Sequence, residues 1–136
     1  MNKAKLLYYA TAFAGGGIVL SFELLNYKII APYFGASLFV WASIIGASMV
    51  GLLIGYLFSS SIISKNKNDL ARIIGLITLV AGVFTILQPL IEAGVYSVVR
   101  GMSIQVGAFL GTLTLIVPFF ALLGLISPLT LSLIHI

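Results

Sequence analysis

Glu23 is the residue in this sequence whose type and position point most clearly to chemistry. It is one of three acidic residues. It lies near the end of an apolar segment that runs from about Leu6 to Leu25. An ionisable side chain inside a membrane span is costly and commonly marks a functional site. We expect the helix to end two or three residues beyond Glu23, near the interface. Two roles are therefore open: a structural carboxylate that meets interfacial water or Lys28, and a contact for a ligand, proton or substrate.

No other group of residues forms a catalytic, cofactor or metal motif. The chain has no cysteine, which excludes thiol nucleophiles and thiolate metal sites. Its single histidine is not paired with an acid that would activate a hydroxyl, and its carboxylates are spread over three segments. Gly15, Gly16 and Gly17 lie inside an apolar run rather than between a strand and a helix, so they do not match a phosphate-binding loop.

Composition assigns the chain to the membrane. Hydrophobic residues make up 61% of the sequence and charged residues 7%, whereas a soluble domain has roughly a quarter of its residues charged. We predict an all-α membrane protein with about four transmembrane helices, because one span needs about 20 apolar residues. The predicted spans are about 6–27, 38–60, 70–88 and 105–127. The lipid bilayer is the expected partner, and no basic stripe indicates binding of nucleic acid.

Small residues recur at helical spacing, which is typical of close helix contacts in membranes. In the second span they recur every four residues and include the GxxxG pair Gly51 and Gly55. In the first span, small residues share a face with Glu23. The predicted packing residues are Gly15, Gly16, Ala47, Gly107 and Gly111.

Prolines and polar residues set the predicted ends of the spans. Pro32 and Pro89 are expected to end the first and third spans, because proline lacks the amide donor that continues a helix. Residues 90–103 then form either a short amphipathic helix in the interface, with Glu92 and Arg100 exposed to water, or a plain loop. A kink is expected at Pro118 and a stop near Pro128.

Lysine and arginine counts predict the orientation. Five positive residues flank the N-terminus and the central loop (Lys3, Lys5, Lys65, Lys67 and Arg72), against Lys28 and Arg100 on the other side. By the positive-inside rule the N-terminus, central loop and C-terminus are expected in the cytoplasm. We predict a multi-pass protein of the plasma (inner) membrane of a prokaryote.

The last six residues, 131–136, match the translation of a DNA sequence that is not expected in a natural gene. Leu-Ser-Leu-Ile-His-Ile is the peptide that a transposon end used to prepare sequencing libraries would encode. We therefore expect a transmembrane domain over residues 1–130, a non-native tail over 131–136, and a parent protein longer than this truncated fragment. His135 would then have no function.

Residues 23–56 resemble the N-terminal membrane region of spermidine-synthase-like integral membrane proteins, in which this domain is fused to a polyamine aminopropyltransferase. The resemblance is carried by an acid at the end of the first span, a Pro-x-Phe-Gly-x-Ser turn, a tryptophan and a Gly-Leu-x-x-Gly-Tyr helix. The matching residues, whose role is unknown, are Glu23, Pro32, Phe34, Gly35, Ser37, Trp41, Gly51 and Gly55.

The resemblance implies a membrane anchor that also feeds polyamine, or another amphiphile, to a missing cytoplasmic transferase domain. Decarboxylated S-adenosylmethionine would belong to that missing domain, and no cofactor is expected in this fragment. Whether the parent is an active enzyme stays open. Two alternatives also remain: a fragment of a helical-bundle transporter, whose coupling acid would lie in the first span, and a purely structural membrane subunit.

Overall fold

The computed structural model describes residues 3–65 and 69–135, with the side chains of 3–5, 7, 8, 11, 12, 134 and 135 left aside. Within these ranges the chain forms four helices and no strand. They are α1 (Lys3–Phe34), α2 (Leu38–Lys65), α3 (Leu70–Val99) and α4 (Ile104–His135). Each contains a stretch long and apolar enough to cross a membrane. The all-α membrane class and the number of four spans are thereby confirmed.

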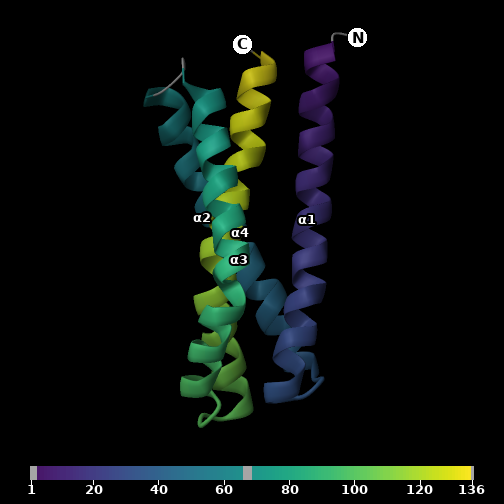
Figure 1. Ribbon diagram of the computed structural model, residues 1–136, viewed down its shortest axis with the longest axis vertical. Helices are drawn as coiled ribbons and strands as arrows, with labels where there is room; N and C mark the ends of the chain where they lie inside the picture. The colour runs from purple at the N-terminus through teal and green to yellow at the C-terminus, as the bar shows by residue number, and fades with distance from the viewer. Residues whose placement is uncertain (1–2, 66–68, 136) are drawn as a thin grey trace.

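The helices run up and down along one long axis (Figure 1). The start of α1, the end of α4 and the connection between α2 and α3 lie at one end of the bundle. The connections from α1 to α2 and from α3 to α4 lie at the other. Helix α4 contacts all three other helices, so it forms the centre of the bundle.

The closest helix contact joins α2 to α4 and depends on glycine. A Cβ atom added at Gly55 would collide with backbone atoms of Ala121 and Gly124, and one added at Gly51 would lie 2.7 Å from the Cβ of Phe120. The small residues at four-residue spacing on α2 are all buried: Ser43, Ala47, Gly51, Gly55 and Ser59. Small side chains let two backbones approach in a membrane, where helices associate through packing rather than through the hydrophobic effect.

A second set of glycines receives aromatic rings on α4. An added Cβ at Gly107 would lie 2.6 Å from the ring of Phe34, and one at Gly111 would lie 2.8 Å from the ring of Tyr96. In contrast, no atom lies within 4 Å of the Cβ positions of Gly15 and Gly16. The prediction that these two glycines pack against another helix is therefore wrong for the described structure.

Helices α1, α3 and α4 extend beyond their predicted ends. The prolines that were expected to end these helices lie inside them instead. Pro32 is in α1, Pro89 in α3, and Pro118 and Pro128 in α4. Membrane helices tolerate proline because neighbouring groups and local adjustments satisfy the freed carbonyl. The predicted end of span three at Gln88 and the stop near Pro128 are both wrong. The predicted boundary at residue 130 falls inside α4 and stays a prediction.

Residues 90–99 continue α3 and form neither a separate interfacial helix nor a loop. The predicted amphipathic pattern is present, but two residues of its polar side, Glu92 and Tyr96, are buried rather than exposed to water. On the apolar side Val98 is 72% exposed and Val99 is buried. In a membrane the apolar side faces lipid, and the polar side turns toward protein.

Candidate intramembrane polar site

Glu23 lies further inside α1 than predicted. The helix continues to Phe34, eleven residues beyond Glu23, which corresponds to about 16 Å at the helical rise. The expectation that the helix ends two or three residues beyond Glu23 is therefore wrong, because α1 continues for two more turns than predicted.

Glu23 and Ser48 form a polar contact between α1 and α2. The hydroxyl of Ser48 donates to Oε1 of Glu23 at 2.5 Å, and Ser48 Oγ also lies 2.9 Å from the carbonyl oxygen of Ile45. Ser48 is 1% exposed. A hydroxyl carries a single proton, so these two acceptors share one donor.

A second polar contact joins α1 to α3 through three side chains. Nε2 of Gln88 donates to Oδ1 of Asn26 at 3.2 Å and to Oε1 of Glu92 at 2.5 Å. Asn26 in turn donates to the carbonyl of Phe22. Gln88 and Glu92 lie four residues apart on one face of α3. Asn26 is 1% exposed and Glu92 is 7% exposed.

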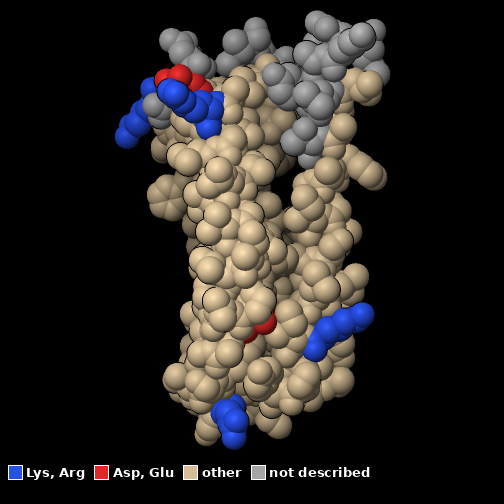
Figure 2. Space-filling view, in the orientation of Figure 1, with Lys and Arg blue, Asp and Glu red and all other residues tan. Residues whose placement is uncertain are grey.

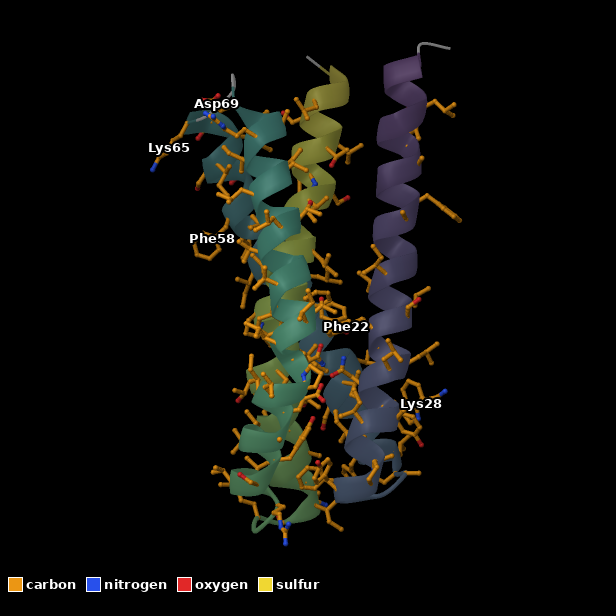
Figure 3. All side chains as sticks on the ribbon, viewed as in Figure 1. Phe22, Lys28, Phe58, Lys65 and Asp69 are labelled. Carbon is orange, nitrogen blue, oxygen red and sulfur yellow. The ribbon has the colours of Figure 1, made fainter. Side chains whose placement is uncertain are left out.

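These five side chains, Glu23, Asn26, Ser48, Gln88 and Glu92, are called the polar cluster below. Its two halves adjoin because Glu23 and Asn26 are three residues apart on α1, which places them on neighbouring turns of the same side. The space-filling view shows acidic surface in a hollow between the helices in the lower part of the bundle, at about the height of the basic side chain labelled Lys28 in Figure 3 (Figure 2). The sequence analysis missed Asn26, Ser48 and Gln88 as members of a site.

A cavity of about 190 Å³ opens beside the polar cluster, between α1 and α3. Asn26, Gln88 and Glu92 line it together with Thr85 and Pro89. Because proline has no N–H, Pro89 cannot donate to the carbonyl of Thr85, its partner one turn earlier in a regular helix. The wall of the cavity thus contains a backbone acceptor without its usual donor.

Tyr96 adds a buried hydroxyl one turn beyond Glu92. Its side chain is fully buried, and its hydroxyl is the one fully enclosed side-chain polar atom without a hydrogen-bond partner in the described part of the chain. The phenol and the Glu92 carboxylate interact electrostatically. An enclosed hydroxyl without a partner costs free energy, and Tyr96 does not line the cavity beside the polar cluster.

The polar cluster has more acceptors than donors. Both N–H groups of the Gln88 amide are engaged within it, and two carboxylates and an amide oxygen accept. Among the described residues no lysine or arginine forms an ion pair with Glu23 or Glu92. Lys28 points away from the bundle (Figure 3), and Arg100 is exposed. The predicted pairing of Glu23 with Lys28 is absent, and Glu92 is not the water-exposed partner of Arg100 that the sequence suggested.

The other residues of the resemblance lie outside the polar cluster and shape the fold. Gly35 takes a positive φ of 80° between α1 and α2. Ser37 Oγ accepts from the backbone N–H of Val40 at 3.4 Å at the start of α2, and Trp41 stacks on Tyr27. Pro32 lies in the last turn of α1.

Comparison of the chain with known proteins does not test the resemblance. No protein-family model, curated protein or solved structure matches the chain. Within the described residues no group of three or more potential ligands forms a metal site. The function must therefore be argued from the polar cluster itself.

Proposed function

We propose that this chain is a membrane domain that binds an ammonium cation within the membrane, in the cavity beside the polar cluster. Glu92 supplies the principal negative charge, and Glu23 supplies a second one on the adjacent helix. An ammonium group suits the site because it offers three N–H donors and no acceptor. Side-chain carboxylates and amide oxygens are complementary to such a group.

The observation that carries this proposal is the pair of intramembrane carboxylates without a basic partner in the described structure. A charge in the bilayer core is expensive, and it usually faces a cavity and marks a pathway or ligand site. A purely structural polar contact would need neither two carboxylates nor the adjoining cavity.

Binding of radiolabelled spermidine to the protein in nanodiscs of uncharged phosphatidylcholine tests the proposal. We expect saturable binding, and we expect Glu92→Gln to raise the Kd about tenfold or more. The free energy that a hydrogen bond to a charged group contributes corresponds to about that factor in Kd. Glu23→Gln should weaken binding by a smaller factor, because Glu23 does not line the cavity.

The third acid provides the matched control. Asp69 is exposed at the start of α3, so Asp69→Asn removes the same charge without touching the polar cluster. Equal loss of binding in Asp69→Asn and Glu92→Gln would indicate a general charge effect and contradict the proposal.

The wider role that we propose follows the resemblance of residues 23–56. The domain would anchor an aminopropyltransferase in the inner membrane and present a polyamine to it. Reading the source gene through the codon for Leu131 tests this role. Continuation into a glycine-rich nucleotide-binding domain with paired aspartates would support it, and a frame of further spans alone would not.

A transporter is the second candidate, and the position of Glu23 inside a span favours it. Coupling acids of secondary transporters lie within the membrane, and Glu23 lies eleven residues before the end of α1. Uptake of labelled spermidine into proteoliposomes separates the two roles. Uptake that is abolished by Glu23→Gln favours transport, whereas binding without uptake favours an anchor.

A further inference from the structure

A second cavity adjoins the polar one and is apolar. It is a groove of about 290 Å³ between α1, α3 and α4. Thr85 lines both cavities. Phe22 of the polar cavity stacks on Phe119 of the groove, with ring centroids 3.9 Å apart. The two spaces therefore meet at Thr85 and the pair of phenylalanines.

Glycine keeps the groove open from two sides. Gly15 of α1 and Gly82 of α3 line it, and no atom lies within 4 Å of the Cβ position of either one. The remaining walls are mainly apolar, with Ile18, Leu123 and Ile126 among them. This explains why Gly15 makes no helix contact: it borders a space instead of a neighbouring backbone.

The two cavities lie next to each other along α3 and differ in polarity, with Thr85 and the stacked phenylalanines between them. Glu92 and Gln88 are at one end and Thr78 is at the other. The 14 residues from Thr78 to Glu92 correspond to about 21 Å along the helix. The cavity at the Glu92 end is lined by hydrogen-bond acceptors and negative charge, and the groove at the Thr78 end is lined mainly by apolar groups.

We propose that the joined cavities bind a single-chain alkylammonium amphiphile. Its ammonium head would lie beside Glu92, and its alkyl chain would pass Thr85 into the groove. This inference rests on the proposed function, since it assigns a tail to the same cation. A short polyamine alone leaves the groove empty, and a neutral lipid leaves the carboxylates without a cation.

Photolabelling tests the path of the alkyl chain. The probe is dodecylamine with a diazirine at the end of its chain, added at equal mole fraction to nanodiscs of uncharged lipid that contain the full chain. We expect labelling of groove residues, identified by mass spectrometry of the peptides. Dodecanol with the same diazirine should label them about tenfold less, because it lacks the charge-assisted hydrogen bonds of the head.

Two blocking variants and one control separate the tail from the head. Gly82→Leu and Gly15→Leu fill the groove from opposite sides, and each should lower dodecylamine labelling about tenfold, since a leucine there occupies the path of the chain. Gly75→Leu is the matched control, because Gly75 also has open space at its Cβ position and lines neither cavity. Binding of butylamine, which has no long tail, should be unchanged in all three variants.

The outcomes distinguish the two proposals. If both blocking variants leave dodecylamine labelling unchanged while Glu92→Gln abolishes butylamine binding, the tail assignment fails and the cation site stands. Equal labelling by dodecanol would make the occupant a neutral lipid and overturn the inference. If butylamine does not bind and dodecylamine does not label the groove, both proposals fail.

Discussion

The hydroxyl of Tyr96 is a buried polar atom without a hydrogen-bond partner in the described structure, and the Tyr96 ring stacks on Tyr33. Helical side chains lean toward the N-terminus of their helix, so the ring of Tyr96 leans toward the turn that contains Glu92. Tyr96 does not line the cavity beside Glu92. The unpaired hydroxyl therefore lowers the stability of the fold and is not part of the cation site.

Replacement of Tyr96 by phenylalanine should stabilise the ligand-free protein. Tyr96→Phe removes a buried group whose burial costs about 1 kcal/mol or more, and it keeps the ring that packs on Gly111. We expect a higher melting temperature in neutral detergent, followed by the fluorescence of Trp41, the single tryptophan.

Tyr33→Phe is the control for that variant, because Tyr33 is 47% exposed and its hydroxyl is not enclosed. It should leave the melting temperature unchanged. A lower melting temperature for Tyr96→Phe would mean that the hydroxyl has a hydrogen-bond partner in the protein and would contradict this prediction.

Residue types alone identified part of the site. Glu23 was recognisable as a lone acid in an apolar run, and the spacing of Glu92, Tyr96 and Arg100 was recognisable as one helical face. The burial of that face was not, because the sequence does not show whether an amphipathic segment meets water or protein. Asn26 and Ser48 were not recognisable either, because their hydrogen-bond partners lie on other helices, 62 and 25 residues away in the sequence.

At the scale of the helix, the α2–α4 contact depends on the absence of side chains. Gly55→Ala places a methyl group against backbone atoms of Ala121 and Gly124, which cannot move as a flexible side chain would. We expect destabilisation of about 1–3 kcal/mol, as for overpacking in other cores. Unfolding in increasing mole fractions of dodecyl sulfate measures it.

Gly46→Ala is the control on the same helix, because no atom lies within 4 Å of its Cβ position. It should leave stability unchanged or raise it slightly through helix propensity. Equal stability of both alanine variants would show that α2 and α4 are not in close contact.

Helix existence was easier to predict than helix length. Apolar composition and small-residue spacing were sufficient to identify four spans and the buried stripe of α2. The ends were wrong where proline was treated as a terminator, at Pro89 and Pro128. That rule holds in water, whereas membrane helices continue through proline, and at Pro89 the consequence is that the carbonyl of Thr85 lacks its regular helical donor.

At the scale of the whole molecule, four spans place two of the three connections, α1–α2 and α3–α4, at one end of the bundle, and the start of α1 and the end of α4 at the other. Lys65 and Arg72 lie at the end where α1 begins and α4 ends, while Lys28 and Arg100 lie toward the other end (Figures 2 and 3). The positive-inside rule assigns the first end to the cytoplasm. Under the proposed function, a cation would reach the polar cluster through the cavity between α1 and α3.

Cysteine labelling in intact cells tests this orientation with little background, because the chain has no cysteine of its own. Ser64 and Ser103 are both exposed and lie at opposite ends of the bundle. With a membrane-impermeant maleimide, Ser103→Cys should be labelled and Ser64→Cys should be protected, while permeabilised cells should label both. The reverse pattern would place the lysine-rich connection outside. Labelling of both variants in intact cells would contradict a single orientation.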